Sequence, residues 1–225
     1  MGVKRVWIIE KGNSRWKIGE FNDDALINVT TTDVGVVLTD LNLPKADSKS
    51  IDILITGSGN WSNDTLELLK SKGNVTQLRH GDSHPLRTNV TNPGSLGTDR
   101  IANAFAIQEG VIDEALTGNA WLIVDVGTCV TFDLVVDGTH LGGAISPGIS
   151  LRLDSMRIGT AALKEVKKDV WNKKAPLKGE TTGLSSEEAQ IKGPADGISA
   201  EIIGRWQALR EQYSGIGVIL TGGDS

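Results

Sequence analysis

Residues 120–136 read AWLIVDVGTCVTFDLVV, and this stretch decides the fold. The apolar run at 121–124 is typical of a buried β-strand, and the segment 130–136 is typical of a second strand that returns beside it. Between them lie a carboxylate, Asp125, and a short turn at 127–128 that contains glycine. The stretch therefore predicts an antiparallel hairpin with an acid at the end of its first strand.

The same pattern occurs near the start of the chain, where residues 6–14 read VWIIEKGNS. Each stretch has an apolar strand, one acid, one further residue, a glycine and a hydroxyl or amide residue. The two acids, Glu10 and Asp125, are separated by about half of the 225 residues. This repeat favours two related halves, predicted here as residues 1–115 and 116–225. Chance similarity between short apolar strands is the alternative.

The rest of the chain alternates short apolar runs with segments of helical periodicity. Further strands are expected at residues 16–21, 51–55, 75–78, 139–145 and 216–220. Helices are expected at 62–72, from Asp99 onward, from 148 to about Met156, and at 198–213. Strands that alternate with helices indicate an α/β architecture, and the hairpins make its sheets mixed rather than wholly parallel.

The composition excludes several classes of protein. The chain has 23 basic and 28 acidic residues, a net charge of −5, which argues against a nucleic-acid partner bound by phosphate neutralisation. No apolar run reaches the roughly 18 residues of a membrane span, and the N-terminus lacks a signal-peptide pattern. The single cysteine, Cys129, excludes an internal disulfide and is expected to be a small buried residue. A cytoplasmic protein without a membrane partner is therefore expected.

The two strand-end turns have a chemistry in common. Glycine-rich turns with hydroxyl or amide side chains present backbone N–H groups that bind phosphate oxygens. A carboxylate at the strand end can hold Mg²⁺ directly or through water. Two such hairpins would bind a nucleoside triphosphate and its metal from both sides. The phosphate-binding patterns GxxxxGK[ST] and GxGxxG are both absent from the sequence.

Five motifs in a fixed order extend this interpretation. They are Glu10, Gly12, Asn13, Ser14 and Lys17; Pro93 with Leu96, Gly97, Thr98, Asp99 and Arg100; Asp125, Gly127, Thr128, Thr131 and Asp133; Gly142, Gly143, Ile145, Pro147 and Gly148; and Thr221–Asp224. With these motifs the chain resembles type III pantothenate kinase almost from end to end. That family belongs to the actin, sugar-kinase and heat-shock-ATPase superfamily, whose fold is a duplicated ribonuclease-H-like domain. The resemblance implies an α/β fold of two related halves, with mixed sheets flanked by helices.

The resemblance also implies an activity and a set of site residues. The activity is ATP-dependent phosphorylation of pantothenate to 4'-phosphopantothenate, the first step of coenzyme A biosynthesis. Asp99 would be the general base on the primary hydroxyl. Pantothenate would contact Val90, Gly97, Thr98, Asp99, Arg100 and Ser186. ATP would contact Glu10, Gly12, Asn13, Ser14, Lys17, Gly127 and Thr128.

Metal ions and a second subunit complete what the resemblance implies. Mg²⁺ would accompany ATP, and Glu10 and Asp125 would be the metal-binding carboxylates. A monovalent cation, K⁺ or NH₄⁺, would lie beside Asp125. The functional unit would be a homodimer in which the partner subunit closes the pantothenate pocket.

The residues at the expected helix start suit these roles. Phosphoryl transfer depends mostly on positioning and charge stabilisation, with an acid that accepts the proton of the hydroxyl. Asp99 lies where the helix dipole favours an ionised carboxylate. Arg100 offers a fixed fork of donors for a carboxylate, which pantothenate has.

The sequence departs from the family pattern at three positions and at its end. Glu10 replaces an Asp, Val90 replaces an aromatic residue that is usually Tyr, and Ser186 stands for the Thr of a Gly-x-x-Thr element. A rival alignment of that element ends at Thr182. The sequence also ends one residue after Thr221–Asp224, where the family continues with a helix and a strand. These departures leave two alternatives open: a kinase for another small alcohol, and a catalytically weak or silent nucleotide-binding accessory protein on the same fold.

Overall fold

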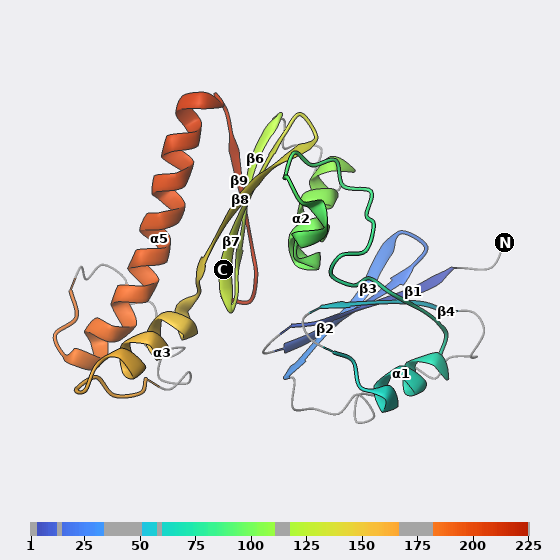
Figure 1. Cartoon of the computed structure of the whole chain (residues 1–225), viewed down its shortest axis with the longest axis horizontal. Helices are drawn as coiled ribbons and strands as arrows, with labels where there is room; N and C mark the ends of the chain where they lie inside the picture. Colours follow the sequence, from blue (N-terminus) through green and yellow to red (C-terminus); the bar gives the residue numbers. More distant parts are fainter. Residues whose placement is uncertain are drawn as a thin grey trace. The chain divides into compact units, whose positions relative to one another are not determined.

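A computed structural model describes residues 4–12, 15–33, 51–57, 60–110, 118–166 and 182–224. The chain divides into two compact units (Figure 1). Met1–His84 and Asn92–Asp99 form the first unit, and Pro85–Thr91 and Arg100–Ser225 form the second. Helix α2 (Thr98–Gln108) therefore begins in one unit and continues in the other. In the described residues, no helix combines the length and apolar character needed to cross a membrane.

The first unit contains a five-stranded sheet of order β3-β2-β1-β4-β5. Its elements are β1 (Arg5–Lys11), β2 (Arg15–Asn22), β3 (Ala25–Asp33), β4 (Ile51–Gly57), α1 (Asn63–Lys70), β5 (Asn74–Gln77) and the 3₁₀ turn η2 (Pro93–Ser95). Strand β2 is antiparallel to both β1 and β3, whereas β4 is parallel to both β1 and β5. The sheet is therefore mixed, as predicted.

Alternating apolar residues give this sheet one buried face. Trp7 and Ile9 of β1 are almost fully buried, and so are three isoleucines of β4. Helix α1 covers that face with Leu69, and it begins at an N-cap, Ser62, whose Oγ accepts the N–H of Thr65. Burial of these large side chains on one face holds β1 and β4 at the centre of the sheet.

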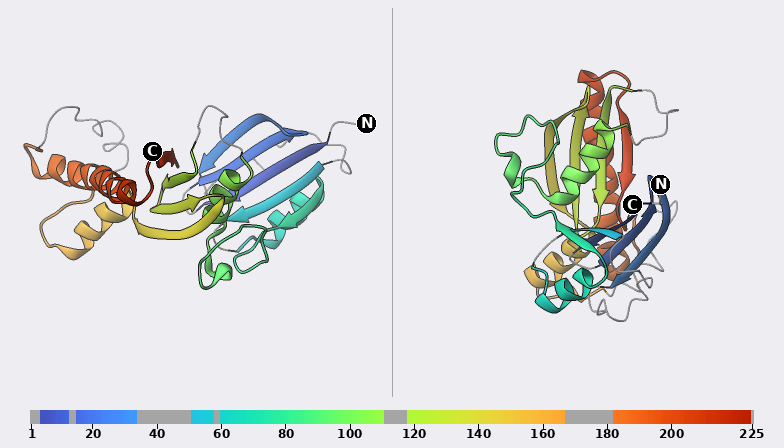
Figure 2. Two further views of the ribbon diagram at one scale, coloured as in Figure 1. Left: turned by 90° about the horizontal axis from the view of Figure 1, so that it is seen from above. Right: turned by 90° about the vertical axis from the view of Figure 1, so that its right-hand side faces the viewer.

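The second unit contains a four-stranded sheet of order β8-β7-β6-β9. Its elements are β6 (Ala120–Val126), β7 (Cys129–Val136), β8 (Thr139–Pro147), α3 (Ile149–Gly159), α5 (Ser186–Gln212) and β9 (Gly217–Thr221). Figures 1 and 2 show that α2 lies over one face of this sheet and α5 over the other. Coverage of both faces explains why all but one residue of β6 is buried.

The two sheets repeat one arrangement at their centres. Hairpin β1–β2 has a parallel neighbour, β4, and hairpin β6–β7 has a parallel neighbour, β9. Thr56 lies opposite Glu10 in the first sheet, and Thr221 lies opposite Asp125 in the second. The duplicated α/β fold is thus confirmed. The division at residues 115 and 116 stays a prediction, because 111–117 lie outside the described ranges.

Three details differ from the expectations. Helix α5 begins at residue 186 rather than at 198, although Pro194 lies inside it. Strand β3 was not predicted, because its apolar residues Leu26, Ile27 and Val29 do not alternate strictly with polar ones, and in the structure all three are more than half exposed. Cys129 is exposed rather than buried, because it opens β7 next to the turn, before the strand enters the core.

Candidate active site

The first strand-end turn lies at the tip of hairpin β1–β2. Glu10 and Lys17 are opposite each other in the two strands, and Lys17 Nζ is 3.4 Å from Glu10 Oε2. Both side chains are partly exposed, at 46% for Lys17 and 35% for Glu10, so solvent screens their attraction. The Gly12 N–H donates to the Arg15 carbonyl and closes the turn. Asn13 and Ser14, predicted to bind ATP, lie outside the described residues.

The second strand-end turn lies at the tip of hairpin β6–β7. Asp125, predicted to hold a cation, is partly buried, and its Oδ2 accepts a hydrogen bond of 3.1 Å from Asn103 Nδ2 on helix α2. The Gly127 N–H donates to the Cys129 carbonyl within the turn. Thr128 follows Gly127 and is partly exposed. Asn103 was not predicted, since a single Asn inside a helical stripe gives no sequence signal.

Two other motifs pack against this second turn. The Gly148 N–H donates to the Thr128 carbonyl at 3.0 Å, and the Asp224 N–H donates to the Val126 carbonyl at 3.0 Å. Gly222 approaches the Val126 backbone so closely that a Cβ there would overlap the Val126 carbonyl oxygen. The Gly-Gly-x-Ile-x-Pro-Gly and Thr-Gly-Gly-Asp motifs therefore both contact the backbone of this turn, although each lies well beyond it in the sequence.

The predicted general base lies in the first turn of α2. Asp99 is exposed, and Thr98 before it is buried. Gly97 lies so close to the Asp99 carboxylate that a side chain at 97 would collide with it. The position at a helix N-terminus stabilises the negative charge of the carboxylate.

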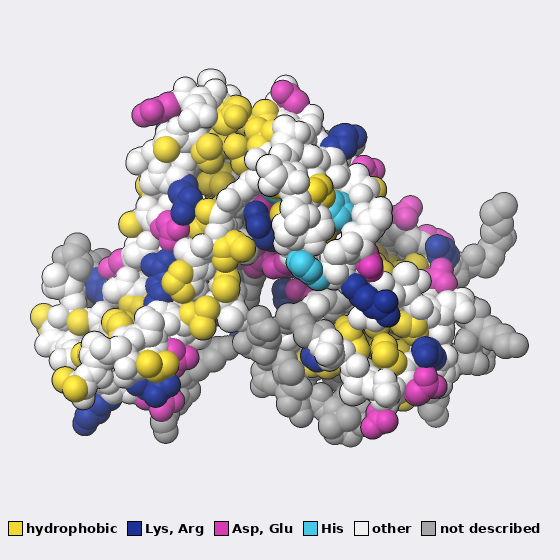
Figure 3. All heavy atoms as spheres, in the orientation of Figure 1, with side chains coloured by type: hydrophobic (Ala, Val, Ile, Leu, Met, Phe, Trp, Pro, Cys, Tyr) yellow, Lys and Arg dark blue, Asp and Glu magenta, His cyan; other side chains and the backbone are white. Residues whose placement is uncertain are grey.

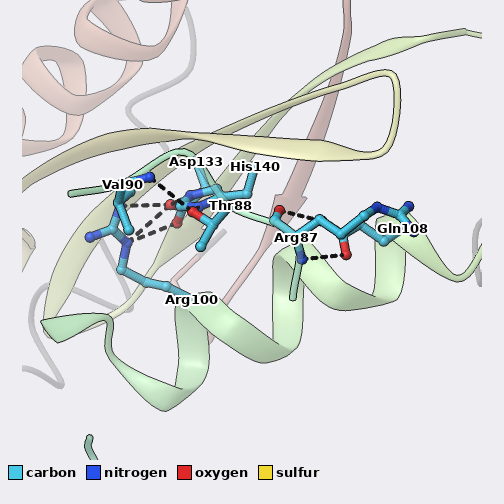
Figure 4. A network of polar contacts seen from close by, with 7 residues as sticks. All are labelled: Arg87, Thr88, Val90, Arg100, Gln108, Asp133 and His140. Atoms are coloured by element: carbon cyan, nitrogen blue, oxygen red, sulfur yellow. Dashed lines mark hydrogen bonds and ion pairs between the residues drawn. The ribbon is translucent and has the colours of Figure 1, made fainter. Parts of the chain in front are cut away.

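Arg100 and Val90 come together around Asp133 in the second unit (Figure 4). Arg100 Nε is 3.0 Å and its Nη2 is 2.6 Å from Asp133 Oδ1. The Val90 N–H donates to Thr88 Oγ1 at 3.3 Å, and Thr88 contacts His140, which in turn donates to Asp133. Asp133, a member of the third motif, is almost fully buried and paired, as suits a structural residue of strand β7. The sequence motifs did not point to His140 or Thr88.

The predicted substrate hydroxyl residue begins helix α5. Ser186 is exposed and is the first helical residue. The cap itself is Ser185, whose Oγ accepts the Glu188 N–H at 3.2 Å, and Glu188 Oε2 accepts the Leu184 N–H. Ser186 is therefore not needed as the cap. The rival residue, Thr182, is exposed and lies before the helix.

A small pocket of about 150 Å³ lies beside the Thr-Gly-Gly-Asp loop. Apolar side chains of α3 line it, together with the carboxylates of Asp154, Glu165 and Asp224. Three carboxylates repel phosphate oxygens, so the pocket does not suit the phosphates of a nucleotide. In the described part of the chain, no three metal-ligating side chains are arranged so that they could hold one metal ion. Mg²⁺ in nucleotide sites needs only one or two carboxylates besides phosphates and waters.

The two sheets with the same central arrangement define the class of protein, a duplicated α/β fold. Among solved structures, the chain is similar to one described as a Baf family transcriptional activator from Campylobacter jejuni, with a TM-score of 0.52 and 18% identity over 95% of this chain and 90% of that one. It is also similar to the ethanolamine utilization protein EutJ from Carboxydothermus hydrogenoformans, with a TM-score of 0.51 and 10% identity over 99% of this chain and 78% of that one. At these identities the similarity concerns the fold alone.

Sequence comparison gives the family. The profile of type III pantothenate kinase matches residues 6–204. A type III pantothenate kinase from Christiangramia forsetii is 35% identical over 70% of this chain and 60% of its own length. One from Cytophaga hutchinsonii is 30% identical over 97% of this chain and 86% of its own length. The chain belongs to the type III pantothenate kinase family.

Proposed function

We propose that this chain transfers the γ-phosphoryl group of ATP to the primary hydroxyl of pantothenate and forms 4'-phosphopantothenate, the first step of coenzyme A biosynthesis. The observation that carries the proposal is the pair of residues at the start of α2. Asp99 is exposed in the first turn, and Arg100 beside it is anchored by Asp133. A free carboxylate next to a fixed guanidinium suits an alcohol substrate that carries a carboxylate.

Each residue has a defined task in this reaction. Asp99 accepts the proton as the hydroxyl oxygen attacks the γ-phosphorus, and ADP leaves. Arg100 binds the substrate carboxylate, and Gly97, Thr98, Val90 and Ser186 are the other residues assigned to pantothenate. ATP is bound by the two strand-end turns, through Glu10, Gly12, Asn13, Ser14 and Lys17 in the first turn and Gly127 and Thr128 in the second.

The carboxylates at the strand ends suit a cation. Asn103 holds one oxygen of Asp125, so the carboxylate is oriented and its other oxygen can face a cation. Mg²⁺ bound with ATP neutralises charge on the phosphates. We assign Asp125 and Glu10 to metal binding, with K⁺ or NH₄⁺ beside Asp125. A cytoplasmic location is part of the proposal.

A homodimer is also part of the proposal. Several large apolar side chains of the second unit are exposed, among them Ile145 of β8 at 60%, Ile158 of α3 at 74% and Ile203 of α5 at 52%. Figure 3 shows hydrophobic side chains gathered over α3 and the adjoining end of α5. Exposed apolar groups of this kind support a subunit interface. Light scattering is expected to give a dimer, and an active monomer would contradict the shared pocket.

The deciding experiment is a coupled assay of ADP release with purified protein, Mg²⁺-ATP, K⁺ and pantothenate. A reaction without pantothenate is the blank, and Asp99→Asn is the matched variant, because it keeps the size of the side chain but removes the base. Pantothenate-dependent ADP release that falls below about a tenth in the variant is expected, with little change in ATP affinity. Retention of more than that would contradict the role of Asp99. No turnover in the wild type, with ATP still bound, would contradict the proposed reaction.

A further inference from the structure

A buried polar network joins β7, β8 and α2 to the segment at residues 87–90 (Figure 4). Asp133 and His140, at its centre, are 1% and 0% exposed. Asp133 Oδ1 accepts hydrogen bonds from Arg100 and, at 2.8 Å, from His140 Nε2. The other ring nitrogen of His140, Nδ1, is 2.9 Å from Thr88 Oγ1. One imidazole therefore connects a buried ion pair to a hydroxyl on a different segment.

The donors and acceptors give this network a direction. An ionised carboxylate only accepts, so His140 Nε2 carries a hydrogen and donates it to Asp133. In a neutral imidazole Nδ1 then accepts, and Thr88 donates its hydroxyl hydrogen to it. The oxygen of Thr88 in turn accepts the Val90 N–H at 3.3 Å. With these hydrogens, each hydrogen bond on the path from Val90 through Thr88, His140 and Asp133 to Arg100 has one donor and one acceptor.

Backbone bonds reinforce the same connection. The His140 N–H donates to the Arg87 carbonyl at 3.0 Å, and the His140 carbonyl accepts the Asn89 N–H at 2.9 Å. Both the main chain and the side chain of His140 therefore hold the segment 87–90 in place. Arg100 is held from the opposite side of the ring, through Asp133.

We propose that His140 is a positioning residue for the alcohol substrate: it orients Arg100 through Asp133 and the backbone at Val90 through Thr88. The inference rests on the proposed function, because Arg100 and Val90 are the residues assigned there to pantothenate. Asp133 occupies the Nε and Nη2 donors of Arg100, so its orientation decides where the remaining Nη1 edge points. Without the His140 donor, Asp133 Oδ1 loses a partner and the ion pair can shift, and a shift of about 1 Å at a binding group can cost up to about 100-fold in rate.

A purely structural role for His140 predicts something different. Loss of a fully buried side chain would destabilise the fold and lower the amount of active enzyme, without a selective effect on one substrate. Gln108 provides the matched control. It fixes the same segment by two bonds to the Arg87 backbone, of 3.1 and 2.7 Å, and makes no bond to Asp133, Thr88 or His140.

The test compares His140→Phe, His140→Gln and Gln108→Leu by steady-state kinetics on folded protein. His140→Phe is expected to raise the KM for pantothenate at least about tenfold, with the KM for ATP changed less than about twofold. His140→Gln is expected to restore the KM to within about threefold of wild type, because its Nε2 amide can donate to Asp133. Gln108→Leu is expected to change that KM less than about twofold. Equal effects of His140→Phe and Gln108→Leu, or an equal rise in both KM values, would overturn the proposal.

A double-mutant cycle tests whether His140 acts through Arg100. In an Arg100→Lys background, His140→Phe is expected to raise the KM for pantothenate by less than about twofold more, because the group it positions is already lost. Multiplicative effects of the two changes would place the action of His140 elsewhere and overturn the assignment.

An NMR readout separates this inference from the proposed function. Ring-nitrogen spectra of the wild type are expected to show His140 protonated at Nε2 alone, and the Arg100 Nε–H is expected to exchange slowly and to lose that protection in His140→Phe. If the wild type turns over no pantothenate, the proposed reaction fails, and these spectra still decide whether His140 orients Arg100. A hydrogen on Nδ1 alone, or an Arg100 signal unchanged by the substitution, would overturn the positioning role.

Discussion

The two strand-end turns have the same residue pattern but are stabilised differently. In the second turn, Asp125 is held by Asn103, and backbone bonds from Gly148 and Asp224 fix the main chain on either side. In the first turn, the acid Glu10 is paired with an exposed lysine across the hairpin. The second turn is therefore preorganised by packing, whereas the acid of the first is placed by a solvent-screened ion pair.

This difference has a consequence for sequence tolerance. A carboxylate enclosed by neighbours must keep its length, since each contact depends on where the oxygens lie. A carboxylate paired at the surface can be longer by one methylene and still reach its partner. The family's Asp is retained at 125 and replaced by Glu at 10, which agrees with this distinction.

The largest expected effect concerns the glycine that each sheet places against its turn. Gly57 has φ +124° and approaches the Lys11 backbone, and Gly222 has φ +103° and approaches the Val126 backbone. Either glycine, changed to Ala, would combine an unfavourable φ with overlap onto a carbonyl oxygen. Each substitution is expected to lower the free energy of unfolding by about 2–4 kcal/mol, measured by urea denaturation.

Gly215→Ala is the control for that prediction. Gly215 has φ +80°, but an added Cβ would meet no atom within 4 Å. It is expected to lower the free energy of unfolding by only about 1 kcal/mol, the cost of the left-handed conformation alone. If Gly57→Ala were no more costly than Gly215→Ala while Gly222→Ala cost far more, the two halves would not be equivalent at this position.

The next prediction compares how much the KM for ATP depends on the partner of Asp125 and on the partner of Glu10. Asn103→Leu removes the donor that orients Asp125, and the KM for ATP is expected to rise about tenfold in the coupled assay. The matching substitution in the first turn is Lys17→Met. It removes the exposed partner of Glu10 and also a proposed ATP contact. That change is expected to raise the KM for ATP about threefold. A larger effect for Lys17→Met would reverse the order of importance of the two turns.

Much of the fold could be predicted because its signals are local. The central hairpin at 120–136 is continuously apolar up to an acid and a glycine, and the two-residue turn at Asp137 has the positive φ angles that its sequence favours. The start of α5 could not be predicted in the same way. Pro194 interrupts the local helix signal, and burial of Ile191 and Ile198 against the rest of the unit outweighs it.

In the candidate site, too, residues with a local sequence signal could be predicted, and residues that depend on long-range contacts could not. Asp99, Arg100 and Asp125 stand out because motifs surround them. Asn103 and His140 do not, because each matters only through a partner that the chain brings close in three dimensions: Asn103 is 22 positions from Asp125, and His140 is 52 positions from Thr88. Long-range polar pairs of this kind leave no periodic signal in a single sequence.

A smaller effect, on the pH dependence of the free energy of unfolding, is expected from the different burial of the ion pairs in the two units. In the first unit the described pairs are exposed, such as Lys4–Asp52 at 68% and 50%. In the second, Glu201 of α5 is partly buried, with its side chain 21% exposed, and accepts hydrogen bonds from Arg152, Ser146 and Arg205. Burial raises the pKa of the Glu201 carboxyl, but the hydrogen bonds from Arg205, Ser146 and Arg152 lower it more, so the pKa lies below its ordinary value of 4.5.

The sign of the pH dependence follows from that lowered pKa. The stabilisation by Glu201 is complete above the pKa of the unfolded chain and is lost as the pH falls through the lower pKa of the folded state. Between about pH 5 and about pH 3 the wild type is expected to lose about 1 kcal/mol more unfolding free energy than Glu201→Gln. Urea titrations at several pH values measure this, and identical pH profiles of the two proteins would exclude the contribution.

The smallest effect is expected at Glu10 itself. Glu10→Asp shortens the side chain that faces Lys17 at 3.4 Å and lengthens a pair that solvent already weakens. The free energy of unfolding is expected to change by less than about 0.5 kcal/mol, and kcat is expected to stay equal or to rise, because Asp is the family's residue at this position.

Asp125→Glu is the reciprocal substitution. It moves a carboxylate that Asn103 holds in place and is expected to lower kcat/KM for ATP about tenfold or more. If Glu10→Asp instead abolished turnover while Asp125→Glu was tolerated, the first turn would be the one adapted to its acid, and the contrast between the two turns would be reversed.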